Sequence, residues 1–446
     1  MLLAYLFIAL AIVRDNGAFA GLPFMLVAVA LLHRALARGE GAPRRWTVAL
    51  FFAVFAVVAW WHSASFYFTD GAPCWPLVAV TLGQCGLGAL VCLRPRVPPR
   101  LALAASLALF AALGASAIHR TAEPRIDLFF IQRDGARALL AGQNPYNATF
   151  PNPYDAAETR SYFGDGRRAL SEYPYPPLSL LATTLGLLAG GDVRYALLAA
   201  QLGIALVLFA VARRNQKPPW FALALPILHL ANPRGAFVLE QSWTDALPAL
   251  CFVGLLTIPS FFGARRDAAT PPPLRDELAA ALWLGLLLAF KQYGVLLLPL
   301  LCHPRGPRLR TLALAVGIAA AVSLPLFLWD PRAFINDVLL FQLRQPFRLD
   351  AMSLAPLLAR ISGWRAPGAL ALVAAAAAMA FGWRRIAGPR TFALVAALTY
   401  CWFFLTAKQA FCNYYYFLGV LVLGAAAVRD PGDWQPPTQR TQPAPA

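Results

Sequence analysis

Charged residues are scarce in this chain of 446 residues. Only 13% are Asp, Glu, Lys or Arg, whereas about 25% is usual for a soluble protein. Acidic residues are the scarcer kind, with 21 Asp and Glu against 38 Lys and Arg and a formal net charge of +17. Hydrophobic residues make up 59% of the chain, and its mean hydropathy is +0.58. This composition excludes an ordinary soluble domain and is typical of a polytopic membrane protein.

The excess of basic residues does not form one basic surface. Lys and Arg lie in short clusters between apolar runs, and such clusters are typical of cytoplasmic loops. The charge therefore predicts contact with a lipid bilayer and no nucleic-acid partner. The stretch MLLAYLFIALAIV lacks a basic n-region and a small-residue cleavage site, so we expect a first span there rather than a signal peptide. The basic clusters are HRALARGEGAPRR, RPRVPPR, ARRNQK, ARRD, HPRGPRLR and WRRIAGPR.

Spacings typical of metal or redox centres are also missing. The cysteines form no Cys-x-x-Cys pair, the histidines show no His-x-His or His-x-x-x-His spacing, and no Asp-x-Asp pair occurs near Asp127. The sequence therefore predicts no metal ion and no cofactor. The cysteines are expected to be small side chains buried in the membrane. They are Cys74, Cys85, Cys92, Cys251, Cys302, Cys401 and Cys412.

The apolar runs predict an all-α polytopic membrane protein with about 12–13 transmembrane helices. We expect an N-terminal four-helix membrane extension at 1–98, a main membrane domain at 99–428 with its main extracytoplasmic loop at 118–174, and a disordered cytoplasmic tail at 429–446. The runs cover roughly 2–13, 19–37, 46–62, 74–93, 101–118, 194–212, 220–238, 245–262, 311–328, 367–383, 391–407 and 414–428.

Two apolar segments do not fit as simple crossings. Residues 175–189 would reach only about 22 Å as a helix, short of the roughly 30 Å hydrocarbon core. If this segment crossed, the next basic cluster would lie outside, so we expect a re-entrant or interfacial helix. Segment 278–302 carries Lys291 at its middle, and a hairpin that turns at Lys291–Gly294 keeps both of its ends on the cytoplasmic side. Non-helical backbone at that depth must line a cavity.

With this topology, charge is distributed unevenly across the membrane. Of the Lys and Arg residues, 21 lie on the cytoplasmic side and 17 outside, whereas only six of the Asp and Glu residues lie on the cytoplasmic side and 15 lie outside. Most acids therefore face outward beside a nearly balanced set of cations. We expect the polar machinery on the extracytoplasmic face.

The longest outward loop begins with a predicted amphipathic helix. Residues 127–142 alternate apolar and polar positions at helical spacing, and Gly142 is expected to end the helix. We expect this helix to lie on the membrane surface. Asp127 is at its start, and Asp134 follows seven residues later, about two turns, so both carboxylates can share one face.

Other outward segments carry polar side chains that can form a site. Lys291 is the hardest to explain by structure alone, since a charge placed mid-segment costs a few kcal/mol at membrane depth. Taken singly, Lys408 fits a lysine that snorkels from a helix end, and the tyrosines at 414–416 fit interface anchors. Yet the Lys-Gln dipeptide occurs at both 291–292 and 408–409, each beside tyrosine or phenylalanine, which favours a single outer cavity into which both lysines point. The candidates are Tyr146, Tyr175, Glu240, Gln241, Asp245, Lys291, Gln292, Arg344, Arg348, Lys408, Gln409, Asn413, Tyr414 and Tyr415.

An outward carboxylate, several cations and an apolar groove suit group transfer from a lipid-phosphate donor. Phosphate leaves without a protonated acid, so one carboxylate that deprotonates an acceptor hydroxyl is enough. Lys and Arg stabilise the charge that develops on the departing phosphate. Tyrosine and tryptophan rings can stack on sugar faces.

Four stretches of the chain resemble membrane glycosyltransferases of the GT-C class, closest to the bacterial polyprenyl-phosphate-dependent mannosyltransferases of glycosyltransferase family eighty-seven. The stretches are ALLAGQNPY (138–146), YPYPPLSLL (173–181), FKQYGVLLLPLL (290–301) and KQAFCNYYYF (408–417). The resemblance implies a GT-C-like bundle at 99–428. It also implies inverting, metal-independent transfer of a mannose-like hexose or a pentose from a polyprenyl-phosphate donor to a glycan or glycolipid acceptor.

The resemblance implies that the catalytic base is Asp127, with Asp134 as a rival, on the extracytoplasmic face of a bacterial inner membrane. We further predict that cations bind the donor phosphate and that Asp134 and the remaining candidates bind substrate. The predicted phosphate-binding cations are Lys291, Lys408, Arg344 and Arg348.

Functions of two other classes stay open. A transporter or flippase of a lipid-linked or anionic substrate predicts internal repeats and ionisable residues at mid-membrane, and the sequence shows no convincing repeat. A membrane scaffold without catalysis predicts that Asp127, Lys291 and Lys408 do not converge.

Overall fold

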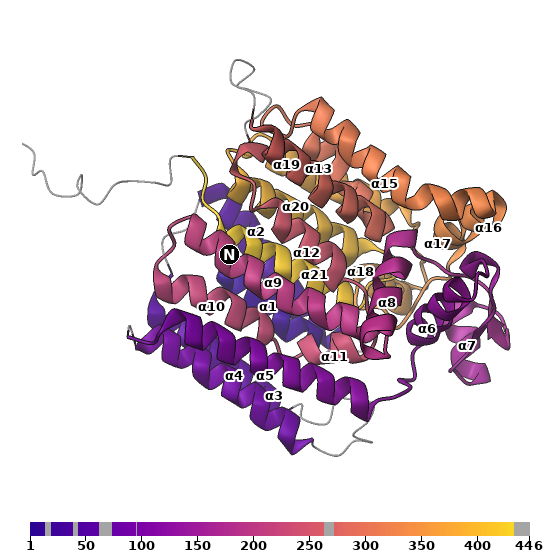
Figure 1. Ribbon diagram of the computed structural model, residues 1–446, viewed down its shortest axis with the longest axis horizontal. Coiled ribbons are helices and arrows are strands. Elements are labelled where there is room, and N and C mark those ends of the chain that lie inside the picture. Colours follow the sequence, from indigo (N-terminus) through magenta and orange to yellow (C-terminus); the bar gives the residue numbers. More distant parts are fainter. Residues whose placement is uncertain (14–18, 39–42, 62–73, 95, 263–271, 432–446) are drawn as a thin grey trace, which may run out of the picture.

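Helices make up 75% of the chain and strands 1%, which confirms the all-helical class. The protein is described from a computed structural model that covers residues 1–13, 19–38, 43–61, 74–94, 96–262 and 272–431. The long helices run roughly along one axis and form a bundle (Figure 1). Of the predicted tail at 429–446, residues 432–446 lie outside the described part.

The bundle consists of thirteen helices in the described part of the chain. They are α1 (Leu2–Val13), α2 (Leu22–Arg38), α3 (Arg45–Trp61), α4 (Trp75–Leu93), α5 (Pro99–Arg120), α9 (Arg194–Arg214), α10 (Pro219–Leu230), α12 (Ala246–Leu255), α13 (Leu274–Phe290), α15 (Leu309–Trp329), α19 (Ala369–Trp383), α20 (Pro389–Thr406) and α21 (Cys412–Ala427). Proline occupies the first turn of α4, α5, α10 and α20, where its missing N–H would have had no helical partner.

The remaining elements connect these helices. They are η1 (Phe19–Gly21), α6 (Asp127–Leu140), η3 (Pro145–Asn147), β1 (Phe150–Pro151), α7 (Ala156–Phe163), β2 (Ala169–Leu170), α8 (Pro177–Gly190), α11 (Gly235–Glu240), η4 (Pro259–Phe261), η5 (Gln292–Leu297), α14 (Leu298–Leu301), α16 (Pro331–Ile335), the π-helical turn η6 (Asn336–Leu340), α17 (Phe341–Arg344) and α18 (Leu354–Ser362). The two strands pair antiparallel, with Phe150 opposite Leu170.

Five helical segments are long and apolar enough to cross a membrane by length and composition. They are Phe19–Arg38, Trp75–Leu93, Pro99–Arg120, Arg194–Arg214 and Leu309–Trp329. Other apolar helices are shorter; α1 and α10 have 12 residues each, or about 18 Å of helix. The fold is therefore compatible with a helical membrane protein. The larger number of spans expected from the apolar runs stays a prediction.

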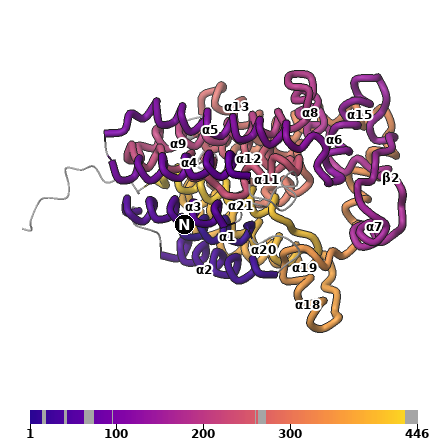
Figure 2. Tube along the Cα trace, turned by 90° about the horizontal axis from the view of Figure 1, so that it is seen from below, coloured from indigo at the N-terminus to yellow at the C-terminus, as the bar shows by residue number. Residues whose placement is uncertain are grey.

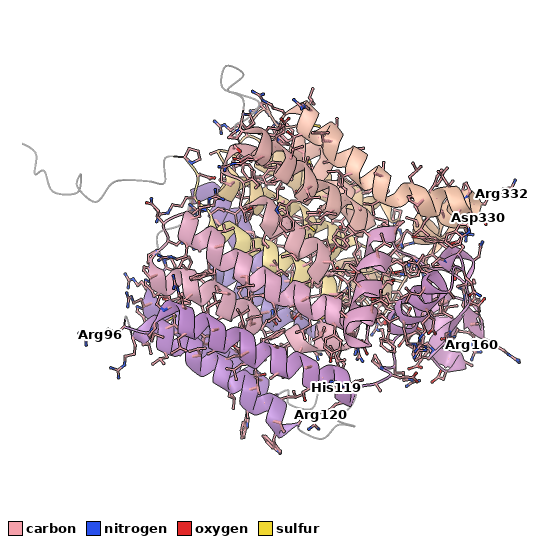
Figure 3. All side chains as sticks on the ribbon, in the orientation of Figure 1. Arg96, His119, Arg120, Arg160, Asp330 and Arg332 are labelled. Carbon is pink, nitrogen blue, oxygen red and sulfur yellow. The ribbon has the colours of Figure 1, made fainter. Side chains whose placement is uncertain are left out.

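Basic residues of the described clusters lie at one end of the bundle, and the loops around α6 and α16 lie at the other. Figure 3 shows Arg96 at one end and Arg160 and Arg332 at the other. At the Arg96 end, Arg214 at the close of α9 donates a hydrogen bond to the carbonyl of Thr257 after α12. At the opposite end, α6, α7 and β2 gather (Figure 2). We call these the basic end and the loop end; which of them faces the cytoplasm stays a prediction.

The first helices share their core with the last ones. α1 packs between α2 and α21, and α2 packs against α20. The Tyr5 hydroxyl donates a 2.7 Å hydrogen bond to the carbonyl of Leu228 in α10. Buried side chains of both parts belong to one hydrophobic cluster. The predicted extension at 1–98 is therefore not separated in space from 99–428.

Two predicted spans are shorter than expected. The run at 220–238 is not one helix, because α10 ends at Leu230 and α11 begins at Gly235. Pro233 lies between them and has no N–H with which to continue the helical hydrogen bonds. Likewise, α12 ends at Leu255 rather than at residue 262. The prediction of single long helices at these two places was wrong.

The chain turns back after α13, as the hairpin prediction requires. Lys291 is extended, with φ −147° and ψ 144°, and η5 then packs along α13. Gly294 allows this close approach, because a Cβ there would lie only 3.1 Å from the carbonyl oxygen of Leu287. The depth of this turn in a membrane stays a prediction.

Helix α8 has both of its ends near the loop end. Close to its start, the Ser179 hydroxyl donates to the carbonyl of Phe290 at 2.7 Å. Just after its end, Arg194 donates to the carbonyl of Ile118, in the last turn of α5, at 3.1 Å. The arrangement fits a segment that does not traverse the bundle, although its re-entrant course through a bilayer stays a prediction.

The amphipathic helix expected at 127–142 is α6, and Gly142 follows it with a φ of +72°. Its apolar face is buried in the protein, whereas we expected it to rest on the membrane. Gly135 lies against the Tyr173 ring, and Phe129 belongs to a second hydrophobic cluster at the loop end. Packing on α8 and the strand pair therefore holds α6 in place.

The contact between α13 and α15 yields a stability prediction. A Cβ at Gly285 would lie 2.7 Å from the carbonyl oxygen of Ala315 and 2.8 Å from Cβ of Ile318. Gly285→Ala should therefore force the helices apart and lower the free energy of unfolding by about 1–3 kcal/mol. Gly317→Ala is the control, since a Cβ there meets nothing within 4 Å. Equal thermal unfolding of both variants in detergent would contradict this packing.

Candidate functional site

A buried ion pair lies where three segments meet at the loop end. Lys291 Nζ is 2.8 Å from Asp245 Oδ2, and their side chains are 3% and 0% exposed. The Asn413 amide donates to the same oxygen at 2.7 Å, and the Tyr293 hydroxyl donates to Asp245 Oδ1 at 2.9 Å. The pair thus joins the start of α12, the turn after α13 and the start of α21. Buried charges of this kind persist only when they are paired and hydrogen-bonded.

Aromatic rings surround the Lys291 ammonium. Its nitrogen is 5.3 Å from the centre of the Tyr175 ring, 5.5 Å from that of Tyr293 and 5.4 Å from that of Tyr414. These are favourable cation–π distances. The rings and Asp245 together compensate the charge of Lys291, the residue that the sequence predicted to bind a donor phosphate; that role stays a prediction.

Asp127 is the carboxylate of the second half of the site. It begins α6, where the helix dipole favours a negative charge, and it is partly exposed. The Tyr154 hydroxyl donates to Asp127 Oδ1 at 3.0 Å, as does the Leu128 N–H at 2.8 Å. Within the described residues, Oδ2 accepts no hydrogen bond. Burial raises the pKa of Asp127, while the hydrogen bond from Tyr154 and the charge of Arg348 oppose that rise.

Arg348 brings a positive charge close to Asp127. Its guanidinium pairs with Asp350 at 2.6 Å and keeps 18% of its side chain exposed. The group is stacked 4.0 Å above the Tyr162 ring and lies 4.9 Å from the centre of the Phe411 ring. Stacking and pairing hold the guanidinium in place, and its charge acts on Asp127.

Tyr175 and Tyr414 connect the ion pair with the outer carboxylate. The Tyr175 hydroxyl interacts electrostatically with both Asp127 and Asp245. The Tyr414 hydroxyl interacts with Asp245 and with Arg348. The two halves are therefore neighbours, and the structure brings Asp127 and Lys291 to one region.

The backbone around Tyr175 is held from several sides. The Tyr146 hydroxyl donates to the carbonyl of Tyr175 at 2.8 Å, and Gln292 donates to that of Pro174 at 2.7 Å. Asp337 accepts the N–H of Tyr173 at 2.8 Å, and burial raises the pKa of Asp337 to about 6. Tyr146 and Gln292, predicted to bind substrate, thus position the backbone that carries Tyr175.

Asp134 lies in a different environment from Asp127. Its carboxylate pairs with Arg133 at 2.8 Å and with Arg137 at 3.2 Å on the surface of α6. Arg133 also pairs with Glu123. Although only seven residues apart on α6, Asp127 lies in the candidate site, whereas Asp134 belongs to a surface network of ion pairs.

Lys408 and Gln409 bind the outer loop rather than the ion pair. Lys408 Nζ donates to the carbonyls of Leu343 and Gln345, and Gln409 donates to that of Pro346 at 2.9 Å. The Lys408 carbonyl in turn accepts the N–H of Arg348 at 3.2 Å. The two Lys-Gln dipeptides do not share partners, but Lys408 supports Arg348. Arg344 is exposed and donates to Leu340 and Asn336.

The remaining candidates, Glu240, Gln241 and Tyr415, are buried in the protein. Glu240 accepts a 2.8 Å hydrogen bond from Thr121, and Gln241 is 1% exposed. The Tyr415 hydroxyl donates to the carbonyl of Met352 at 2.6 Å, away from Lys291. Glu240 is thus buried rather than in an exposed outer loop, and Tyr415 is not an interface anchor.

Three site residues were missed at the sequence level. Tyr293 lies within Lys291–Gly294, where residue type alone indicates the charged Lys291 as the candidate. Tyr154 and Asp337 lie far from their partners along the chain, with Tyr154 27 residues from Asp127 and Asp337 164 residues from Tyr173. No local pattern could have indicated these pairings.

Metal-ligating groups do not converge in the part of the chain that the structure describes. It contains no cluster of three or more His, Cys, Asp or Glu residues suited to a metal ion. None of the seven cysteines, all of which lie in the described residues, forms a disulfide. Six are buried as expected, but Cys302 is exposed, because it follows the last turn of α14.

Comparison with protein-family models, with curated proteins and with solved structures gives no match. The chemical capacity of the site therefore follows from its geometry. A partly exposed carboxylate with a raised pKa can accept a proton, a fixed guanidinium can stabilise an anion, and tyrosine faces can stack on a sugar or another flat apolar surface.

The ion pair predicts a non-additive stability effect. Lys291→Met would leave the Asp245 carboxylate buried without a counter-charge, and Asp245→Asn would do the same to the ammonium. Each single variant should lower the free energy of unfolding by about 3–5 kcal/mol. The double variant leaves no buried charge and should regain part of that loss. Strictly additive losses in thermal or denaturant unfolding would contradict a direct coupling between the two charges.

Proposed function

We propose that this chain is a membrane glycosyltransferase that moves a sugar from a polyprenyl-phosphate donor to an acceptor hydroxyl, with Asp127 as general base. The observation that carries the proposal is the environment of Asp127: a partly exposed carboxylate of raised pKa beside Arg348 and Tyr154. The likeness of four stretches to the GT-C class supports it, with a mannose-like hexose or a pentose as the sugar and the outer face of a bacterial inner membrane as the location.

The reaction needs one base and one anion-stabilising cation. The acceptor hydroxyl gives its proton to Asp127 Oδ2, while its oxygen forms a bond to the anomeric carbon of the donor. The bond from that carbon to the phosphate oxygen breaks, and its electron pair leaves on the polyprenyl phosphate. Attack from the side opposite the phosphate inverts the anomeric carbon. No metal ion takes part in the proposed step.

Among the predicted phosphate-binding cations, Arg348 has the best position. It is partly exposed, rigidly stacked and within electrostatic range of Asp127. Lys291 is deeper and bound to Asp245, so its proposed role is to hold Tyr175 and Tyr414 in place through ring contacts. Lys408 supports the Arg348 backbone.

Asp127 is a better base than Asp134. Two arginines engage the Asp134 carboxylate on the surface of α6, so an acceptor hydroxyl would have to displace them to reach it. Asp127 has Oδ2 available among the described residues and lies beside the tyrosines of the site.

A transporter or flippase of a lipid-linked or anionic substrate is the second candidate. The buried pair of Lys291 and Asp245 at a break between helices favours it, since transporters place ionisable residues at discontinuous helices. Transport requires no proton acceptor, so this second function does not explain why a carboxylate of raised pKa, Asp127, lies near Arg348. Separation of sugar from phosphate distinguishes the two functions.

Substitution of Asp127 tests the base. In membranes supplied with polyprenyl-phosphate-linked labelled sugar, Asp127→Asn should lower transfer by a factor of about 10²–10⁴, because the amide cannot accept the proton. Asp134→Asn is the matched control on the same helix and should leave the rate near that of the wild type. Full activity of Asp127→Asn, or equal losses in both variants, would refute the assignment.

The pH dependence of transfer gives a second test. A base works as carboxylate, so activity should fall as the pH falls through the pKa of Asp127. Tyr154→Phe removes a hydrogen bond that lowers this pKa, and the acid limb of the rate profile should therefore move to higher pH. Arg348→Gln should move it in the same direction and also weaken donor use. Tyr162→Phe is the control, because it keeps the ring that contacts Arg348 and Tyr154 and removes only the hydroxyl. An acid limb that does not move in Tyr154→Phe would contradict the role of Asp127.

A further inference from the structure

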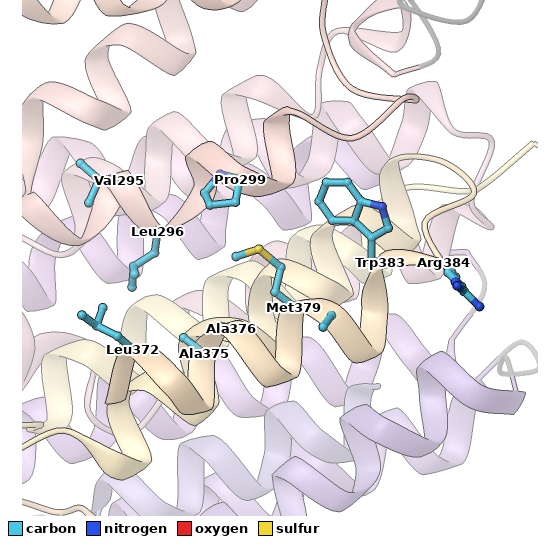
Figure 4. Close-up of a pocket in the computed structure, with 10 residues that line it drawn as sticks. Val295, Leu296, Pro299, Leu372, Ala375, Ala376, Met379, Trp383 and Arg384 are labelled. Atoms are coloured by element: carbon cyan, nitrogen blue, oxygen red, sulfur yellow. The ribbon is translucent and has the colours of Figure 1, made fainter. Parts of the chain in front are cut away.

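An apolar groove lies between α19 and the segment that returns from the Lys291 turn (Figure 4). Its cavity volume is about 600 Å³. One face of α19 forms one wall, and residues 295–299 form the other. The lining residues are Val295, Leu296, Pro299, Leu372, Ala375, Ala376, Met379, Ala380, Trp383 and Arg384. The alanines on α19 leave space for an occupant, and larger side chains at these positions would fill that space.

The groove opens sideways from the bundle. Val295 and Leu372, on opposite walls, are 54% exposed each. Exposed apolar surface of this kind on a helical bundle faces hydrocarbon when the protein lies in a bilayer. From Leu372 to Arg384, α19 rises about 18 Å, more than half of the roughly 30 Å hydrocarbon core. The groove therefore has the length and polarity for an extended hydrocarbon chain.

One end of the groove is basic. Arg384 closes it and is exposed, with no ion pair among the described residues. Arg305, on the segment after α14, donates to the carbonyl of Ile386 and so lies close to this end. His303 packs against the Trp383 ring at 4.8 Å. The stretches 302–310 and 383–390 contain no Asp or Glu. Two carboxylates from other segments contact these stretches and are engaged there, since Asp430 accepts the N–H of Arg390 and Glu277 lies 3.9 Å from Arg310. An anionic headgroup beside Arg384 would therefore meet an exposed cation.

We propose that this groove binds one anionic phospholipid, with an acyl chain between α19 and residues 295–299 and its phosphate on Arg384. Apolar lining that ends in a basic cluster is complementary to such a lipid, because burial of the chain and the charge of the headgroup act together. The headgroup end of the groove lies at the basic end, away from Asp127, and the site does not depend on the proposed glycosyl transfer. The wall formed by residues 295–299 directly follows the turn that carries Lys291. A lipid bound in the groove would therefore also stabilise the position of that turn.

Native mass spectrometry of the full-length protein released from nanodiscs tests the site. The nanodiscs hold phosphatidylglycerol and phosphatidylcholine in a 1:3 ratio, on the order of a mildly anionic membrane. The wild type should retain one phosphatidylglycerol per chain in preference to phosphatidylcholine. Arg384→Gln should reduce this retention about fivefold, the factor for one arginine beside an anionic headgroup. Arg100→Gln, an equal charge change at the exposed start of α5 at the basic end, should leave retention unchanged.

A second pair of variants tests the groove itself. Ala376→Phe fills the cavity and should abolish selective retention, whereas Ala377→Phe, on an exposed position of α19 outside the lining, should not. Equal retention of both lipids by the wild type, or unchanged retention in Ala376→Phe, would overturn the proposal. Loss of bound phosphatidylglycerol when polyprenyl phosphate is added to the nanodiscs, or when two copies of the chain associate, would also overturn the proposal.

Discussion

The buried contact between Lys291 and Asp245 organises the loop end of this protein. A charge this deep in an apolar bundle is costly unless a partner and hydrogen bonds compensate it. Asp245 receives the ammonium, the Asn413 amide and the Tyr293 hydroxyl, so both of its oxygens are engaged. Because the donors come from different helices, the pair fixes the turn after α13 against the starts of α12 and α21.

The outer part of the site is built on this contact. Tyr175 and Tyr414 touch the ammonium with their ring faces and interact through their hydroxyls with charges farther out. Hydrogen bonds from Tyr146 and Gln292 hold the backbone beside Tyr175. Asp127, at the start of α6, and Arg348, in the loop after α17, then lie next to these rings. A fixed inner pair and a partly exposed outer pair suit the proposed group transfer, since the proposed base must reach solvent while its surroundings stay rigid.

The sequence predicted some of this arrangement and missed the rest for identifiable reasons. Helical class, the amphipathic helix α6 and the turn after Lys291 follow from hydrophobic periodicity and from the position of one charge. The break at Pro233 was hidden inside an apolar run, and the packing of α6 on protein could not be told from packing on lipid. Pairing depends on contacts between distant residues: Lys291 and Asp245 are 46 residues apart, and Tyr154 meets Asp127 across a turn-rich loop. Residue type identified Lys291 as important, but only the fold reveals that its charge is compensated.

The proposal of glycosyl transfer depends on whether the sugar leaves its phosphate. The most direct measurement uses a polyprenyl-phosphate sugar labelled with tritium in the sugar and with radioactive phosphorus in the phosphate, added to sealed membranes that contain the wild-type protein. Glycosyl transfer predicts that the labels separate: tritium moves into a glycan or glycolipid product, and the phosphorus label stays with polyprenyl phosphate. If both labels cross the membrane together in an intact molecule, the protein is a transporter and the account is contradicted.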